Sequence, residues 1–223
     1  MKKLAIGCGI AYVLAWVIGL ALASSGPKPD ASASRVTSYF ARHEHTAMGG
    51  HLFVDGIAGL ALIGIALLVL DLLGKDRSVL RLVRLAFFAG LAAAAVSLAQ
   101  FVVGETFTYD AAHGGNPSTV RSLFVTLNNL DTVKIVLLAI MIGAVGVAGR
   151  RTGTLPRWFT TSSIVFAPLL AISGLAFPLN NQALLDSLDV TLLLLLLWAA
   201  TFTTLAARRI PRETTAEARV AAT

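Results

Sequence analysis

The sequence predicts an all-α membrane protein, a polytopic bundle of six transmembrane helices. Of its 223 residues, 56% are hydrophobic and only 13% are charged, whereas a soluble domain carries about 25% charged residues. The apolar residues are gathered in long runs, several of them near the roughly 20 residues that a helix needs to cross a bilayer. Basic residues flank these runs and rarely interrupt them. Together these observations favour a single membrane domain over a soluble one.

The runs divide the chain into four parts. Residues 1–23 form a first transmembrane helix or a signal peptide, 24–50 an outer segment, 51–207 a bundle of five helices, and 208–223 a cytoplasmic basic tail, expected to be disordered. The bundle helices are expected at about 51–73, 85–103, 119–148, 161–177 and 185–207, with Ser118 or Thr119 as the N-cap of the helix that ends at 148. A short surface helix is expected near the end of the outer segment.

The first helix has two interpretations. Lys2 and Lys3, an apolar core and the sequence Ala21-Leu22-Ala23 fit a cleavable signal peptide, which would leave five helices. The apolar core, however, exceeds the usual length of about 7–15 residues and is long enough to span. We favour an uncleaved helix, and cleavage stays open.

The distribution of basic residues predicts the orientation. Five of the 18 Lys and Arg residues fall outside in this scheme, and the other 13 fall in the termini and the loops after the second and fourth helices. The five are Lys28, Arg35, Arg42, Arg121 and Lys134. By the positive-inside rule both termini are cytoplasmic. The basic residues form no face with interleaved aromatics, so nucleic acid is not an expected partner.

Small residues predict which helices pack closely. The third helix carries two rows of small residues at every fourth position, which permit close helix approach. The rows are Ala86, Gly90 and Ala94, and Ala89, Ala93 and Ser97. The sixth helix has an unbroken row, Leu192–Leu197, and is expected to face lipid, with helices two to five as the inner group.

The fourth helix carries the candidate binding site. Its clean apolar run, 135–148, is too short to span, so the span must include Lys134, Asp131 and Asn128. Asp131 and Lys134 share one side of the helix. They are either a structural ion pair near the interface, with Lys134 extended outward, or a proton- or ion-handling site. We favour the first. If the site is functional, Asp55 and Glu105 are expected to line it.

Other polar residues at similar depth are Gln100, Asp186 and Asp189. Because all of these lie toward the outer side, the sequence predicts a polar site open to the outside and closed toward the cytoplasm.

A second candidate is the histidine group of the outer segment. His43, His45 and His51 could bind Zn²⁺ or Cu²⁺ through their imidazoles, and Asp55, four residues after His51, could orient that ring. The alternatives are interface histidines that contact headgroups and a pH-responsive loop. No other cofactor is expected. The single cysteine, Cys8, excludes an intrachain disulfide and a multi-cysteine metal site.

The stretches YFARHEHTAMGGHLFVDGIAGLALIG and TLNNLDTVKI, with the LPRW turn, resemble small polytopic bacterial inner-membrane proteins known only as a domain of unknown function. The resemblance covers helices two to five. It implies a six- or seven-helix protein of the bacterial inner membrane and carries over no catalytic residue.

Three hypotheses for function follow. The leading one is an outward-facing intramembrane site that binds a small solute, ion or lipid headgroup, with transport as one use. The second is a sensor or scaffold that responds through the His-rich loop and binds a partner membrane protein or a second copy of itself. The third is an enzyme acting on lipid or envelope substrates. It is the least favoured, because no nucleophile is singled out.

Overall fold

A computed structural model describes residues 2–23, 26–179 and 181–209 of the chain. Within these residues the fold is helical, with no strand, and six helical spans are long and apolar enough to cross a membrane. The predicted all-α bundle is therefore confirmed. The predicted tail falls outside the described residues from position 210 on, and so do the two residues, 24 and 25, that follow the candidate cleavage position.

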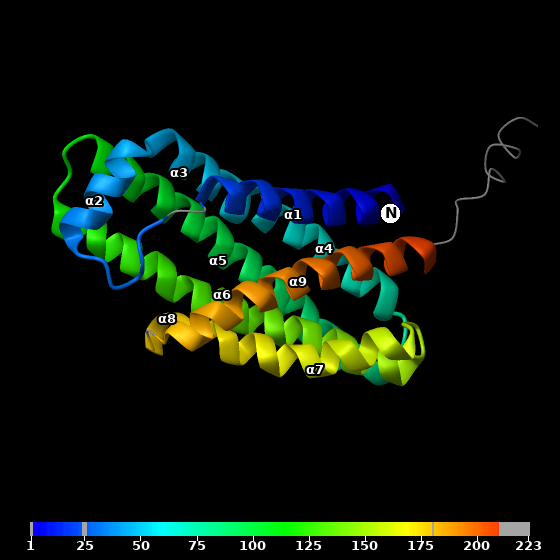
Figure 1. The fold of residues 1–223 in the computed structure, drawn as a ribbon. Helices are drawn as coiled ribbons and strands as arrows, with labels where there is room; N and C mark the ends of the chain where they lie inside the picture. Colours follow the sequence, from blue (N-terminus) through cyan, green and yellow to red (C-terminus); the bar gives the residue numbers. More distant parts are fainter. Residues whose placement is uncertain (1, 24–25, 180, 210–223) are drawn as a thin grey trace, which may run out of the picture.

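The long helices run back and forth along roughly one common direction (Figure 1). In chain order they are α1 (Lys2–Ala23), α2 (Ala33–Arg42), α3 (Glu44–His51), the π-helix η1 (Leu52–Ile57), α4 (Ala58–Leu73), the 3-10 helix η2 (Arg77–Val79), α5 (Leu80–Ala112), α6 (Pro117–Thr152), α7 (Arg157–Gly174), α8 (Ala176–Leu179) and α9 (Gln182–Arg209). The six spans are α1, then α3 with η1 and α4, then α5, then α6, then α7 with α8, and finally α9.

The two ends of the bundle differ in charge. Figure 1 places the start of α1, the end of α9, and the α4–α5 and α6–α7 connections at one end, which we call the basic end. Arg77 lies in the α4–α5 connection, and the helix ends next to these connections carry Arg81, Arg150, Arg151 and Arg157. At the opposite end, which we call the α2 end, lie α2, α8 and the α5–α6 connection. The structure thus gathers the basic loops on one side, as the positive-inside argument requires.

Helix limits differ from the prediction at the α2 end. Helix α5 continues past Val103 to Ala112, and the predicted cap of α6 was wrong. The N-cap is Asn116, whose Oδ1 accepts a hydrogen bond from the Ser118 backbone N–H at 2.9 Å, and Pro117 follows it. Asn is a strong N-cap, and Pro favours the first helical position because its missing N–H would have no helical partner there.

Close packing of the small-residue rows is confirmed. All six residues of the two rows on α5 are buried. Gly90 lies so close to α4 and α6 that a Cβ there would be 3.0 Å from Ala66 Cβ and 2.7 Å from Met141 Sδ. Helix α6 packs mainly between α5 and α7, while α1 packs against α4 and α9. The contact of α4, α5 and α6 around Gly90 is therefore made by closely packed side chains.

Helix α1 is an integral part of the bundle. It buries Ala5, Tyr12, Ala15 and Trp16 against its neighbours. Helix α9, expected on the lipid side, exposes Leu193 and Leu197 but buries Leu195 and Leu196, and it packs against α1 and α7. The expectation that only helices two to five form the inner group was wrong, because α1 and α9 together make one side of it.

Candidate functional site

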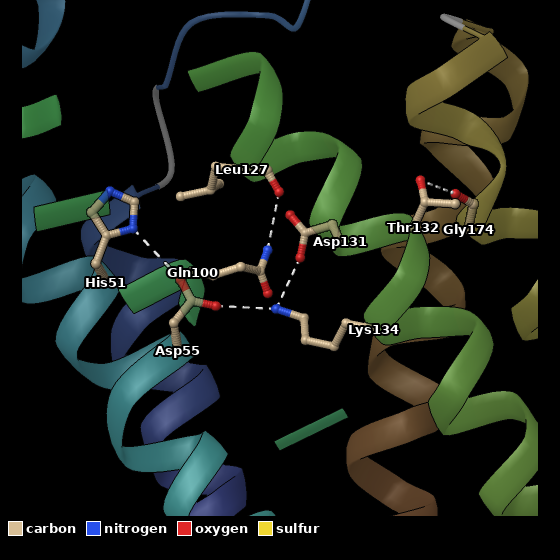
Figure 2. A network of polar contacts seen from close by, with 8 residues as sticks. All are labelled: His51, Asp55, Gln100, Leu127, Asp131, Thr132, Lys134 and Gly174. Atoms are coloured by element: carbon tan, nitrogen blue, oxygen red, sulfur yellow. Dashed lines mark hydrogen bonds and ion pairs between the residues drawn. The ribbon is translucent and has the colours of Figure 1, made fainter. Parts of the chain in front are cut away.

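An ion cluster joins two spans inside the α2 half of the bundle. Lys134 Nζ on α6 lies 3.0 Å from Asp55 Oδ1 on η1 and 2.8 Å from Asp131 Oδ1 on its own helix. Asp55 Oδ2 lies 3.5 Å from His51 Nδ1. Figure 2 shows the chain of contacts that runs from His51 through Asp55 and Lys134 to Asp131. We call these four residues the ion cluster.

Burial decides how Lys134 is used. The side chains of Lys134 and Asp55 are only 4% and 6% exposed. The expectation that Lys134 extends outward to the interface was therefore wrong, because its ammonium turns inward to a carboxylate on another span. A charge at this depth is stable only with a partner of opposite sign. Asp55 supplies that partner across the helix–helix contact, and Asp131 supplies a second one within α6.

The π-helix η1 positions Asp55. Over Leu52–Ile57 the backbone takes a wider turn, and the Ala58 N–H bonds the Phe53 carbonyl. Helix α1 lies very close here, because a Cβ on Gly19 would overlap the Val54 side chain. Short π-helical turns are uncommon and occur frequently at functional sites. This π-helical interruption contains Asp55, and the described chain has no other π-helix.

His51 extends the cluster toward the α2 end. Its ring lies against Gly104 of α5, where a Cβ would be 2.5 Å from His51 Cγ. Phe40 and Phe107 border the ring at centroid distances of 6.5 and 5.6 Å. His51 Nε2 is buried and has no hydrogen-bond partner among the described residues. Only a glycine at position 104 leaves room for the imidazole beside Asp55.

Gln100 brings α5 into the same polar region (Figure 2). Its Nε2 donates a hydrogen bond to the Leu127 carbonyl of α6 at 3.1 Å. The residue is fully buried, and its Oε1 accepts no hydrogen bond from any described residue. A buried carbonyl without a donor is costly. The region around the cluster therefore contains a buried acceptor whose hydrogen-bonding capacity is unused by the described residues.

A cavity of about 580 Å³ ends at the ion cluster. It lies between α6 on one side and α1 and α9 on the other. Residues of α2, α3 and η1 line the part nearer the α2 end. Its ionisable lining residues are Lys28, His51, Asp55, Asp131, Lys134, Asp186 and Asp189. Ligand pockets commonly measure about 300–1,000 Å³. The volume therefore suits a small organic molecule.

The lining changes character with depth. Tyr39, Phe40, Phe124 and Phe177 contribute aromatic walls from α2, α6 and α8. On the side of the basic end, Ile135, Leu138 and Leu195 line the cavity, and all three are buried apolar residues. The cavity is therefore closed by hydrocarbon toward the basic end, and its polar lining lies nearer the α2 end.

The structure separates the predicted site residues into two groups. Asn128, Asp131, Lys134 and Asp55 all line the cavity. Glu105 does not line it, and its buried Oε1 has no partner among the described residues. Because α5 lies behind η1 and α6 as seen from the cavity, Glu105 is placed on the wrong helix for contact with a ligand there.

The outer histidines are dispersed. The His43 ring stacks on Tyr39 at 4.5 Å, with Nδ1 2.9 Å from the Tyr39 carbonyl, and His45 is exposed. His51 instead contacts Asp55. Within the described ranges, no three His, Cys, Asp or Glu side chains gather as a metal-binding group. Zinc or copper binding at His43, His45 and His51 stays a prediction.

Two features of the site escaped the sequence analysis. Trp16 of α1 lines the cavity, and its ring centroid lies 5.6 Å from Lys134 Nζ. Asp186 and Asp189 were identified by depth, but α9 was expected to face away from the inner group. A tryptophan within the first apolar run and two acids at the start of the last one were the available signals. Neither specifies which helices become neighbours.

No protein-family model matches this chain, and neither a curated protein nor a solved structure matches it. The resemblance to bacterial proteins of unknown function stays a prediction. What the fold defines is the class, an integral multi-pass membrane protein with six apolar helical spans. The finer function has to be inferred from the geometry of this chain.

Proposed function

We propose that this is a multi-pass protein of the bacterial inner membrane whose cavity faces outward and binds a small solute, ion or lipid headgroup. Asp131 and Lys134 form the centre of the site, Asp55 completes it from η1, and Asn128 lines its wall. Transport is one use of such a site. The observation that carries the proposal is the cavity of about 580 Å³ that ends on the buried ion cluster.

A purely structural ion pair would not need this setting. A buried ion pair often contributes no more stability than apolar packing would, because both charges lose their hydration. Here the Asp131 side chain is 22% exposed, and both it and Lys134 line an open volume. The π-helix beside them adds an irregular backbone element, of a kind frequently found at functional sites. These features support a ligand site more than a packing device.

The orientation rests on charge. In the proposed topology both chain termini and the loops of the basic end are cytoplasmic, as the positive-inside rule favours. The α2 end, with the cavity lining of Asp186 and Asp189, then faces the outside. Because the apolar side chains of Leu138 and Leu195 line the cavity on the side of the basic end, we expect a ligand to enter from the outer half.

Thiol accessibility tests both the cavity and the orientation. In a Cys8→Ala background, which removes the only native cysteine, single cysteines replace Asn128, Asn129 or Ser78. Asn128 lines the cavity, Asn129 is an exposed neighbour outside its lining, and Ser78 is exposed in the connection at the basic end. Spheroplasts are treated with a membrane-impermeant methanethiosulfonate reagent.

We expect Asn128→Cys and Asn129→Cys to react from the outside and Ser78→Cys to react only after permeabilisation. The reverse pattern would overturn the orientation. If Asn129→Cys reacts while Asn128→Cys stays unmodified, the cavity is closed to solutes and the proposed function loses its basis.

Ligands can then be found by stability. A ligand that binds only the folded protein raises its unfolding free energy by about 2.7 kcal/mol at a concentration of 100 times its Kd. Purified wild type and Asp131→Asn are screened side by side by thermal unfolding in detergent. We expect hits that stabilise wild type and lose the effect in Asp131→Asn. Hits that stabilise both proteins equally bind elsewhere, and a screen with no discriminating hit would argue against the site.

One observation favours the sensor hypothesis as second candidate. His51 is the last residue of α3, and it contacts Asp55 directly. A conformational change in the short helices at the α2 end can therefore reach the ion cluster. The measurement is trypsin cleavage after Arg35 and Arg42 of α2 with and without Zn²⁺, in wild type and His51→Gln. A zinc-dependent change of rate that requires His51 would support sensing. Equal rates in all four samples would remove this candidate.

A further inference from the structure

We infer that the ligand of the cavity is an organic cation, an ammonium-type group carrying apolar substituents, whose positive charge is received by Asp131 with Asp186 and Asp189. This inference rests on the proposed function and names the substrate class of that site. It follows from three features of the cavity, which are the charge of the ion cluster, the remaining ionisable residues of the wall, and the aromatic lining.

The ion cluster has more carboxylates than lysines. Two carboxylates, Asp55 and Asp131, share the single ammonium of Lys134. An uncompensated charge at this depth costs several kcal/mol. Both oxygens of Asp55 have partners, in Lys134 and His51. Asp131, by contrast, has Lys134 as its one side-chain partner among the described residues, and it is the more exposed acid.

A buried acceptor nearby points the same way. Gln100 is fully buried, and its Oε1 receives no hydrogen bond from the residues that the structure describes. Figure 2 shows its carboxamide in the same polar region as Asp55, Asp131 and Lys134. An anionic ligand would add to the surplus of carboxylates around this acceptor, whereas a cation reduces that surplus.

The rest of the wall is acidic too. Beyond the cluster, the cavity is lined by Asp186, Asp189 and a single further cation, Lys28. Gln182 donates a hydrogen bond to Asp186 Oδ1 at 2.8 Å, whereas Asp189 has no partner among the described residues. Walls of one sign concentrate ions of the opposite sign. The cavity as a whole therefore attracts cations toward Asp131.

The size and the aromatic walls indicate an organic cation. A volume of about 580 Å³ is far larger than a bare ion needs. Trp16, Tyr39, Phe40, Phe124 and Phe177 line it. Aromatic faces attract cations within about 6 Å of the ring centroid. Trp16 already presents its ring at 5.6 Å to the Lys134 ammonium, so a cationic group at this place is compatible with the wall.

The test uses two probes of nearly equal size and opposite charge, tetraphenylphosphonium and tetraphenylborate. Equilibrium binding is measured on the full-length protein in phosphatidylglycerol nanodiscs at pH 8, where histidine contributes little charge, with empty nanodiscs as reference. The variants are Asp131→Asn, Asp189→Asn and the matched control Asp110→Asn, an acid of the α2 end that does not line the cavity. Thermal unfolding confirms that each variant is folded.

We expect wild type and Asp110→Asn to bind the phosphonium at least about tenfold more tightly than the borate, a difference of about 1.4 kcal/mol. Asp131→Asn should lose most of this preference, and Asp189→Asn a smaller part. A preference that is unchanged in both variants overturns the inference. If the borate binds as tightly or more tightly, the cavity still binds ligands but the cation inference fails. If neither probe binds, the proposed function fails with it.

The cation can come from a free solute or from a lipid headgroup that carries an ammonium. The phosphonium measurement is therefore repeated in nanodiscs that contain equal parts of phosphatidylethanolamine and phosphatidylglycerol. A severalfold loss of affinity in wild type that exceeds the loss in Asp131→Asn identifies the headgroup as the occupant. Equal changes in both proteins identify a free organic cation.

Discussion

Two sets of buried polar contacts hold this bundle together, and they follow different rules. Around α7 the links are neutral, and every donor has an acceptor. Ser173 Oγ and Thr191 Oγ1 lie 2.8 Å apart, and Trp198 Nε1 donates to Ser163 Oγ at 2.9 Å. Thr132 Oγ1 donates to the Gly174 carbonyl at 2.9 Å. The ion cluster between η1 and α6 is instead charged, has one surplus carboxylate, and borders a cavity.

The difference indicates what each set is for. Hydroxyl and indole groups join membrane helices without a net charge, at a modest gain of about 0.6 kcal/mol for an average contact. If the contact between Asp55 and Lys134 only joined two helices, a neutral pair such as Ser and Thr would be sufficient. A cluster with more carboxylates than lysines that lines a cavity can instead bind a further cation. The following substitutions test this contrast, from the largest expected effect to the smallest.

Lys134→Met should cause the largest loss of stability. It leaves Asp55 and Asp131 close together without a cation, and breaking a buried ion pair typically costs about 3–5 kcal/mol. The free energy of unfolding is measured by denaturant titration in detergent. The double variant Asp55→Asn/Lys134→Met restores the original net charge and should recover most of the loss. If Lys134→Met is as stable as wild type, the cluster is not held together by its charges.

Asp55→Asn and Asp131→Asn should differ, although both remove one carboxylate next to the same ammonium. Asp55 is nearly buried and joins two spans, so we expect a loss of about 1–3 kcal/mol. Asp131 is on the same helix as Lys134 and is partly exposed, so its loss should stay within about 1 kcal/mol. Equal losses in thermal and denaturant unfolding would contradict the distinction between a joining acid and a ligand-facing acid.

Gly104→Ala should disturb the cluster without changing any charge. The new Cβ would meet the His51 ring at 2.5 Å from Cγ, and such overpacking costs about 1–3 kcal/mol. Gly7→Ala is the matched control, because nothing lies within 4 Å of a Cβ at that position of α1. We expect its unfolding free energy to be unchanged or slightly raised. A Gly104→Ala protein as stable as Gly7→Ala would show that His51 is not confined by α5.

Ser173→Ala should have the smallest effect. The neutral link to Thr191 is one contact between α7 and α9, and its coupling is expected near 0.6 kcal/mol. A double-mutant cycle of Ser173→Ala and Thr191→Ala measures this coupling by denaturant unfolding. A coupling as large as that between Asp55 and Lys134 would erase the contrast between the two sets of contacts.

Much of the fold follows from hydropathy and charge. The six spans are visible because each needs a long apolar run, and the grouping of basic loops at one end agrees with the charge count. The small rows of α5 also predicted its close packing. The errors lie where helices leave the apolar region, at Ala112 and Asn116. Outside the bilayer core, capping side chains set the helix limits, and hydropathy carries no information about them.

The sequence predicted only part of the candidate site. Asp131 and Lys134 are neighbours on one helix, so their pairing follows from spacing. Asp55 lies far away in sequence, and its contact with Lys134 depends on where the bundle places η1 relative to α6. Trp16 and Asp189 reach the cavity for the same reason, because α1 and α9 close one side of the bundle. Spacing along one helix shows which side chains share a face, but the neighbours of that face depend on tertiary packing.

The π-helix has a consequence for the whole second span. A π-helical turn accommodates about one residue more than an α-helical turn, and each residue of an α-helix advances it by about 100°. The segment before Leu52, with His51, is therefore rotated by roughly that angle relative to α4, compared with an uninterrupted helix. In the half of this span nearer the basic end, Gly59 lies against α5, and in the half nearer the α2 end the His51 ring lies against α5 while Asp55 reaches Lys134 of α6. Deleting a single residue within Leu52–Ile57 would turn the π-helix into a regular α-helix and rotate His51 back by about 100° relative to α4.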